Sequence, residues 1–151
     1  MRPLAAFSPE SRASIRGVLF DIDDTLTTKG RLTADAYAAV EALRNAGLIV
    51  VPITGRPAGW CDHIARMWPV DGVVGENGAF YFYVDHAEKK LKQRFVKPAS
   101  ERELDRSHLT RVAERILREV PGTALASDQR YREADIAIDF CEDVPALPRD
   151  A

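Results

Sequence analysis

The stretch that decides the fold is "GVLFDIDDTLT", residues 17–27. Its first four residues form a short apolar run with β-branched and aromatic side chains, which predicts a buried strand. Three carboxylates, Asp21, Asp23 and Asp24, follow within four positions. Because burying charge is costly and like charges repel, carboxylates at the end of a buried strand predict a partner that neutralises them.

The segments that follow predict alternating helices and strands. Helices are expected over 33–47 and 58–68, and strands over 48–54 and 73–74. The strands are continuously apolar, which is typical of strands buried on both faces. The expected fold class is therefore α/β, with a parallel, doubly wound sheet.

The sequence changes character after Ala79. An aromatic strand over 80–85, a charged turn and an alternating strand over 91–96 predict a hairpin. An amphipathic helix over 107–120 and an alternating strand over 134–140 follow. We expect three parts, with these bounds: a flexible tail over 1–16, the α/β core over 17–79 and a smaller α+β lobe over 80–151.

Composition excludes several classes of partner. The net charge of −2 shows no basic excess, which argues against binding to nucleic acid or to an anionic membrane. No segment reaches transmembrane length, and the N-terminus lacks the apolar stretch of a signal peptide. The two cysteines, Cys61 and Cys141, are far apart and lack metal-ligand spacing. These features predict a cytoplasmic location.

The acidic cluster predicts phosphoryl chemistry. Ligands of open α/β sheets bind at the carboxyl ends of the strands, where Asp21 and Asp23 lie. If extended backbone continues, their spacing of two points both carboxylates to one side. Such a pair favours a hard divalent cation such as Mg²⁺. One carboxylate can attack a phosphoryl group to form an aspartyl phosphate, while the other exchanges a proton with the leaving oxygen and with water.

Three other interpretations of the cluster compete with this one. An EF-hand loop fails because Leu26 stands where the loop needs Gly and Leu32 where it needs Glu. An ordinary turn or helix cap explains one or two aspartates, but not their place after a buried strand. A signalling receiver domain also uses carboxylates and Mg²⁺, but spreads them over two strands.

Two further motifs follow the next two strands. In "TGRP", 54–57, the Thr54 hydroxyl can bond a phosphate oxygen, the Gly55 amide can approach closely, and Arg56 can add positive charge. In "GENGA", 75–79, the glycines permit a sharp turn and hinge motion, and Glu76 and Asn77 are candidate substrate contacts. Each motif alone also fits an ordinary turn.

Together "DIDDTLT", "TGRP" and "GENGA" resemble the haloacid dehalogenase-like superfamily of phosphohydrolases. Within it they resemble subfamily IIB, which includes Cof-type, sucrose-phosphate and mannosylglycerate-phosphate phosphatases. The motifs cover residues 17–79, and the layout of the later lobe is similar to the α+β cap that this branch inserts. The resemblance implies a Rossmann-like core, a Mg²⁺ cofactor, and a phosphorylated sugar or similar small metabolite as substrate.

The resemblance also implies a role for each candidate residue. Asp21 would be the nucleophile and a Mg²⁺ ligand. Asp23 would be the general acid/base, with its main-chain carbonyl on the metal. Thr25 would order the loop, and Thr54 would bind the transferring phosphoryl group. The remaining candidate substrate contacts are Gly55, Arg56, Glu76, Asn77 and, from the cap, Arg132, for which an exposed strand-end arginine is the alternative.

Two parts of the family's pattern do not occur in this sequence. They are a lysine that stabilises the phosphoryl charge and a late Gly-Asp followed by Asn-Asp. A core with a cap of ordinary size needs roughly 250 residues. We therefore expect an incomplete core whose first strand is an uncovered apolar edge, open to self-association.

Several explanations of these missing parts stay open. The chain is a fragment of a longer enzyme, a second chain supplies the missing strands, or the domain binds a phosphorylated ligand or a partner without turnover. A phosphomutase-like phosphotransferase is a further alternative, because it would share Asp21 and Asp23.

Overall fold

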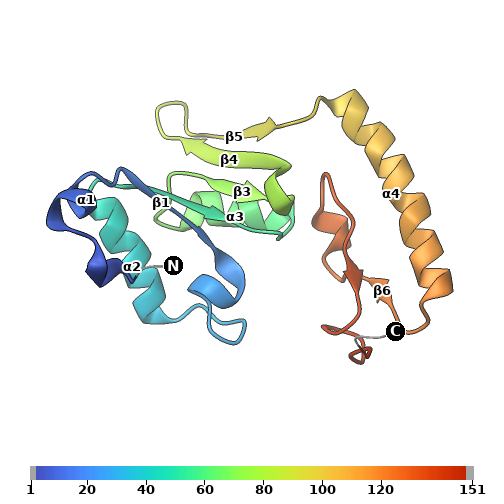
Figure 1. Ribbon diagram of the computed structural model, residues 1–151. Helices are drawn as coiled ribbons and strands as arrows, with labels where there is room; N and C mark the ends of the chain where they lie inside the picture. The colour runs from blue at the N-terminus through green and yellow to red at the C-terminus, as the bar shows by residue number, and fades with distance from the viewer. Residues whose placement is uncertain (1–2, 149–151) are drawn as a thin grey trace.

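The computed structural model describes residues 3–148 and places five strands in one sheet (Figure 1). The first three strands run parallel, and the last two form an antiparallel hairpin that continues the sheet. The predicted α/β class with a parallel core is therefore confirmed. In sheet order, the strands are β1 Gly17–Asp21, β2 Ile49–Ile53, β3 Val73–Gly75, β4 Phe80–Asp85 and β5 Lys90–Phe95.

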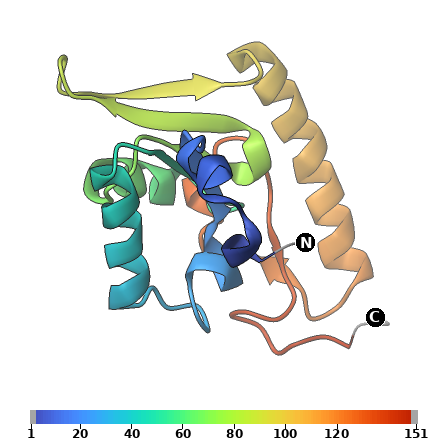
Figure 2. The same ribbon diagram turned by 60° about the vertical axis from the view of Figure 1, so that its left-hand side comes forward.

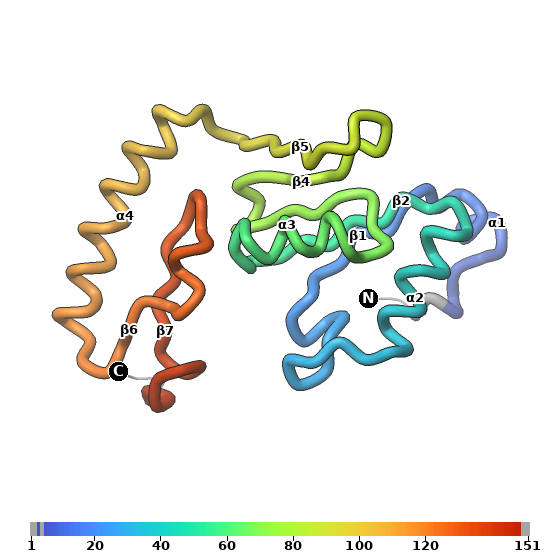
Figure 3. The backbone as a smooth tube through the Cα atoms, turned by 180° about the vertical axis from the view of Figure 1, so that it is seen from behind, coloured from blue at the N-terminus to red at the C-terminus, as the bar shows by residue number. Residues whose placement is uncertain are grey.

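Two helices connect the parallel strands, and both contribute to a single buried cluster on one face of the sheet. α2 spans Ala34–Asn45 and packs on β2, whereas α3 spans Ala58–Met67 and packs on β3 and β4. α3 crosses in front of the strands when the molecule is viewed from behind (Figure 3). The largest fully buried apolar side chains of this core are Phe80, Phe82, Val40, Val50 and Val73.

The opposite face of β1 and β2 is uncovered within residues 3–148. Leu19 and Ile49 are 64% and 56% exposed, and Ile53 is also exposed. The prediction that these strands are buried on both faces is therefore wrong for the described residues. The reason is that the connecting helices lie together rather than on opposite sides. β1 is an edge of the sheet, as expected, because it pairs only with β2 among the described strands.

The hairpin predicted over residues 80–96 belongs to the core sheet. β4 pairs with β3 through Val73↔Phe82, Val74↔Tyr81 and Gly75↔Phe80. The core sheet therefore continues past residue 79, where the sequence placed its end.

The second lobe begins after the hairpin. Its long helix α4 spans Ala99–Glu119, so it begins earlier than the amphipathic pattern at 107–120 indicated. After α4 the chain returns between that helix and the core sheet (Figure 2). There β6 (Ala124–Leu125) pairs with β7 (Ile138–Asp139). The strand predicted over 134–140 is therefore shorter than expected, because only Ile138 and Asp139 form it.

The N-terminal segment, for which the sequence predicted a flexible tail, contains two short helical segments. A 3₁₀ turn spans Leu4–Ala6, and α1 spans Pro9–Ala13. Ser8 caps α1 by accepting the Ser11 N–H, which explains why so short a helix forms. No residue of α1 is buried. Among the described helices, none has both the length and the apolar character that crossing a bilayer requires.

Candidate active site

Residues from all three motifs meet at the carboxyl ends of β1, β2 and β3. An open cavity of about 450 Å³ is lined there by Asp21, Thr54, Gly55 and Asn77, together with apolar strand residues. The register aligns the strand ends, because Asp21 pairs with Ile53 and Ile53 pairs with Val74. The structure therefore brings together residues that lie more than 50 positions apart in the sequence.

The loop after β1 turns sharply at Ile22. Residues Ile22–Leu26 form a single π-turn, and Asp24 has left-handed backbone with φ +55°. Extended backbone, which was the condition for expecting Asp21 and Asp23 to point to one side, therefore does not continue through this loop. Asp21 lines the 450 Å³ cavity, whereas Asp23 lines two neighbouring cavities. Asp24 donates its N–H to the Thr27 hydroxyl and so belongs to the turn.

Thr25 orders Asp21. Its hydroxyl donates to Oδ2 of Asp21 across 3.2 Å. The Thr27 N–H and hydroxyl both bond the Ile22 carbonyl, at 2.9 and 3.0 Å, which closes the turn. These bonds hold the Asp21 carboxylate at the strand end.

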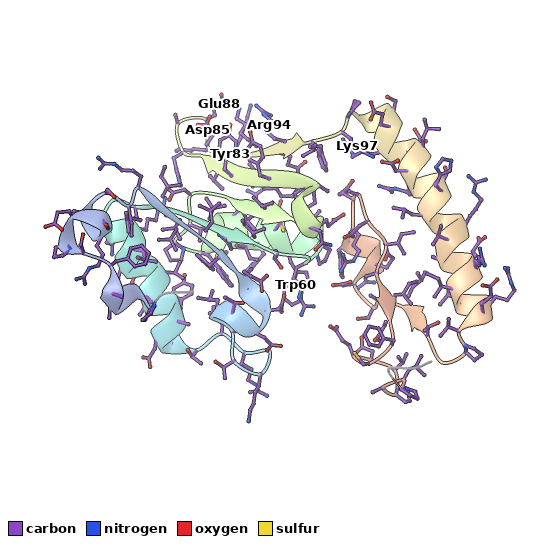
Figure 4. The ribbon with its side chains drawn as sticks, viewed as in Figure 1. Trp60, Tyr83, Asp85, Glu88, Arg94 and Lys97 are labelled. Carbon is purple, nitrogen blue, oxygen red and sulfur yellow. The ribbon has the colours of Figure 1, made fainter. Side chains whose placement is uncertain are left out.

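Arg56 holds the Asp23 carboxylate from the second motif. Nη2 of Arg56 lies 2.8 Å from Oδ1 of Asp23, and Nε lies 3.1 Å from Oδ2. The hydrogen bond to Asp23 raises the pKa of Arg56. The guanidinium also lies 4.9 Å from the centre of the Trp60 ring, and Trp60 lies on the part of the core that faces the second lobe (Figure 4). A forked ion pair of this kind fixes both side chains in orientation.

The second and third motifs are joined by main-chain hydrogen bonds. The Asn77 N–H donates to the Thr54 carbonyl, and the Glu76 N–H donates to the Arg56 carbonyl, each across 3.2 Å. The Thr54 hydroxyl accepts the Arg56 N–H at 3.1 Å. A Cβ at Gly55 would lie 3.1 Å from Oδ1 of Asn77, so glycine permits this close approach.

Gly75 and Gly78 serve different purposes. Gly78 has φ +99°, a left-handed conformation that suits the turn predicted there. Gly75 has φ −120°, so no turn requires glycine at that position. A Cβ on Gly75 would lie 2.4 Å from the Phe80 ring and 2.6 Å from the Cys61 sulfur. Gly75 is thus explained by close packing rather than by a hinge.

Glu76 is a buried carboxylate surrounded by main-chain donors. It accepts N–H groups from Ala58, at the start of α3, and from the second-lobe residues 133, 134 and 135. The sequence suggested a substrate contact at this position. The structure instead gives the carboxylate four partners within the chain.

Arg132 faces the core, as the sequence suggested, and the alternative of an exposed strand-end arginine is wrong. Its side chain is 8% exposed, and Nη1 donates to the Gly55 carbonyl at 3.0 Å and to Asp135 at 2.8 Å. Burial acts to lower the pKa of Arg132, but Asp135 and Asp128 hold it above the ordinary value. Sequence reasoning missed both aspartates, although each lies three or four residues from Arg132.

A second cavity of about 230 Å³ lies between the core and the second lobe. Asp23, Gly55 and Arg56 line it from the core. Residues of the second lobe complete the lining, among them Asp128, Arg132, Ile138, Phe140 and Glu142. This cavity adjoins the carboxylate of Asp23 but not that of Asp21.

The donors at the end of β1 fit Mg²⁺ in part. Carboxylate oxygen is the ligand that Mg²⁺ prefers, and proteins often supply only one or two carboxylates beside substrate phosphate and water. Asp21 offers such a carboxylate, whereas that of Asp23 is paired with Arg56. Over residues 3–148, no three side chains of His, Cys, Asp or Glu gather into a metal-binding group.

Comparisons with known proteins show a family and a fold that this chain resembles. The haloacid dehalogenase-like hydrolase family matches residues 18–109. A Thermoplasma acidophilum protein of known structure superposes with a TM-score of 0.63 at 21% identity, covering 90% of this chain and 53% of its own. The IMP-nucleotidase of Plasmodium falciparum gives a TM-score of 0.51 at 14% identity, covering 82% of this chain and 35% of its own. At these identities the two likenesses show the fold alone.

This chain thus spans about half the length of the first structure and about a third of the second. A search of the curated proteins found no match.

Proposed function

Because this chain belongs to the haloacid dehalogenase-like hydrolases, we propose that it is a Mg²⁺-dependent phosphatase that hydrolyses phosphomonoesters through an aspartyl phosphate. The observation that carries the proposal is the cavity where Asp21, Thr54, Gly55 and Asn77 converge. The proposed substrate is a sugar phosphate or a similar small metabolite, and the proposed branch is subfamily IIB, on the three motifs and the layout of the second lobe. We further propose a cytoplasmic location and no binding to nucleic acid or membrane.

Asp21 supplies the nucleophile. Thr25 donates to Oδ2, which leaves Oδ1 as the oxygen that attacks phosphorus in line with the departing ester oxygen. The Thr54 hydroxyl accepts the Arg56 N–H, so its own hydrogen is directed away and can be donated to a phosphoryl oxygen. The Asp21 carboxylate and the Asp23 carbonyl would hold Mg²⁺, which when bound would neutralise charge on the phosphoryl oxygens.

Asp23 moves the proton. Its carboxyl group is held in a fixed orientation by the two-pronged hydrogen bonds from Arg56. Asp23 then gives its proton to the leaving group and later takes one from the water that releases phosphate.

Substitution of the nucleophile tests this function. Asp21→Asn removes the attacking oxygen, so phosphate release from p-nitrophenyl phosphate with Mg²⁺ should fall by at least about a thousandfold. Asp24→Asn is the matched control, because Asp24 is a neighbouring carboxylate that belongs to the turn. Phosphate release that survives in Asp21→Asn would refute the proposal.

A second candidate function is binding of a phosphorylated ligand or a partner without turnover. It is favoured by the cavity at Asp21, where no lysine is among the lining residues that the structure describes. Under this alternative, a panel of phosphate esters with Mg²⁺ gives no phosphate release, but calorimetry detects saturable binding. Transfer of phosphate to a sugar rather than to water would instead indicate a phosphotransferase.

We also propose that the uncovered β1 edge supports self-association. The apolar side chains next to that edge, Leu19 and Ile49, are more than half exposed. A sedimentation profile that stays monomeric at all accessible concentrations would refute this part.

A further inference from the structure

The carboxylate of Glu76 joins the two halves of the molecule. Oε1 accepts the N–H groups of Ala58 and Glu133 at 2.9 and 2.8 Å. Oε2 accepts those of Ala134 and Asp135 at 2.6 and 3.0 Å. Three successive N–H groups of the second lobe therefore point at one side chain that lies 57 to 59 positions earlier.

Each side of this contact needs the other. Glu76 is only 2% exposed, and an ionised carboxylate at such a depth is costly unless hydrogen bonds compensate it. The N–H groups at 133–135 would in turn lose their acceptors without it. Hydrogen bonds to an ionised acceptor are roughly twice as strong as neutral ones. The few hydrogen bonds that Glu76 accepts from residues 133–135 therefore bind the second lobe strongly to the core.

The backbone of the third motif is shaped to make this contact. Glu76 and Asn77 have φ values of +43° and +57°, a left-handed conformation that costs energy in residues other than glycine. The side-chain amide of Asn77 (Nδ2) also donates to the Asp135 carboxylate (Oδ2) across 3.2 Å. The strained turn thus presents two consecutive side chains to the same segment of the second lobe.

We propose that Glu76 is a positioning residue that docks the turn Glu133–Asp135 onto the core. Docking places Arg132 against the Gly55 carbonyl and Asp135 against both Arg132 and Asn77. It thereby fixes the second-lobe wall of the 230 Å³ cavity beside Asp23.

The consequence for substrate choice rests on the proposed phosphatase function. A leaving group that takes a proton from Asp23 must lie in a cavity next to that residue. Asp23 lines two such cavities, one of about 440 Å³ formed by core residues and one that the second lobe completes, and we assign the leaving group to the latter. The docked cavity of about 230 Å³ is smaller than the roughly 300–1,000 Å³ typical of sites for drug-sized ligands. Its lining includes Asp128, Arg132 and Glu142. Docking by Glu76 therefore selects small, hydroxyl-bearing leaving groups over larger ones.

Amide hydrogen exchange of the whole 151-residue chain tests the docking without any assay of activity. In Glu76→Gln, one of the two oxygens becomes an NH₂ group, so two of the four N–H donors face another donor. We expect exchange at residues 133–135 to accelerate by at least about tenfold, while the amides of the core strands Val50 and Val73 stay protected. Glu133→Gln is the matched control, because its side chain lies in the same turn but outside the contact.

Two results would overturn the docking proposal. One is unchanged exchange at 133–135 in a folded Glu76→Gln protein. The other needs no variant: if these three amides exchange in the unsubstituted protein as fast as unprotected loop amides, Glu76 does not hold them. The second measurement keeps the proposal testable even where the variant fails to fold.

The effect on substrate choice is measured separately. In the unsubstituted protein, kcat/KM should be higher for glycerol phosphate than for a nucleoside monophosphate, and Glu76→Gln should reduce that ratio mainly through KM. An equal or reversed ratio in the unsubstituted protein would refute the size selection. No turnover with either ester would refute the phosphatase function, while the exchange result would still decide the docking.

Discussion

The core sheet and the second lobe are held together by different forces. In the core, side chains from α2, α3 and all five strands of the sheet pack into or against one apolar cluster. In the second lobe, Ala113 is the only buried residue of α4, while the apolar residues Leu104 and Val112 stay exposed. Figure 1 shows α4 standing apart from the sheet, with the returning chain between them. The difference indicates that apolar burial organises the core, whereas hydrogen bonds to a few charged groups organise the lobe.

Asp139 illustrates the second kind of organisation. Its carboxylate accepts the N–H groups of Cys141, Glu142 and Asp143 at 2.9, 2.7 and 2.8 Å. Glu76 and Arg132 make comparable sets of bonds between the lobe and the core. The lobe therefore depends on ionised side chains that accept or donate several hydrogen bonds each.

The largest expected effect is the loss of unfolding free energy when a buried aromatic side chain of the core is removed. Phe82 is 1% exposed and stacks on Phe80, with ring centres 4.4 Å apart. Phe82→Ala should lower the free energy of unfolding by about 3–5 kcal/mol, because it removes a buried ring and leaves a cavity. Urea unfolding at pH 7 measures this loss.

Tyr81 is the matched control for Phe82, because it is the preceding residue of β4 and its side chain is 49% exposed. Tyr81→Ala should cost less than about 1 kcal/mol. Equal losses for the two variants would show that the outer face of β4 is covered in solution. The distinction between a packed face and an uncovered one would then fail.

Local patterns predicted the core because its signals are local. Continuous apolar runs marked β1 and β2, and Thr33 before an alanine-rich run marked the start of α2. The three motifs were placed at strand ends because each directly follows an apolar run. An apolar run has the same pattern whether helices cover one face or two, so the uncovered face of Leu19 and Ile49 was not predictable.

Contacts between distant segments were not predictable from those patterns. The aromatic alternation over 80–96 predicts a hairpin, but nothing in it says that β4 pairs with β3. The π-turn at Ile22–Leu26 was not predicted either, because a sharp turn carries no periodic signal. The second-lobe partners of Glu76 lie almost 60 residues away, so its buried position and its role follow only from the folded chain.

The reactivity of the two cysteines provides a second comparison of the core with the second lobe. Cys61 of α3 is fully buried, whereas Cys141 of the lobe is exposed. Burial raises the pKa of the Cys61 thiol to about 12, and the nearby Glu76 carboxylate adds to this rise. At pH 8, Cys141 should react with a thiol reagent at least about a hundredfold faster than Cys61, because the thiolate is the reactive form and reagents must reach it.

Mass spectrometry after a timed reaction distinguishes the two sites. Cys141→Ser should abolish the fast phase, and Cys61→Ser should leave it unchanged. Comparable rates at both cysteines in the native protein would show that α3 opens from the sheet readily. The core would then be no more tightly held than the lobe.

The smallest expected effect concerns pH and the turn at Asp139. Hydrogen bonds from the turn's N–H groups, with that of Glu142 the strongest, lower the pKa of Asp139 below its ordinary value. A carboxylate with a lowered pKa in the folded state contributes stability above its unfolded pKa of about 4, and loses that contribution as pH falls through the folded value. Asp139→Asn should therefore lower the thermal midpoint at pH 7, and the difference should shrink as the pH falls below about 4 and through the lowered pKa of the folded state. Asp143→Asn is the control, because Asp143 takes part in the turn by donating its main-chain N–H to Asp139, which the substitution leaves in place. A midpoint difference that persists unchanged at low pH would mean that the ionised state of Asp139 does not hold the turn, and the lobe's dependence on ionised groups would fail at its clearest example.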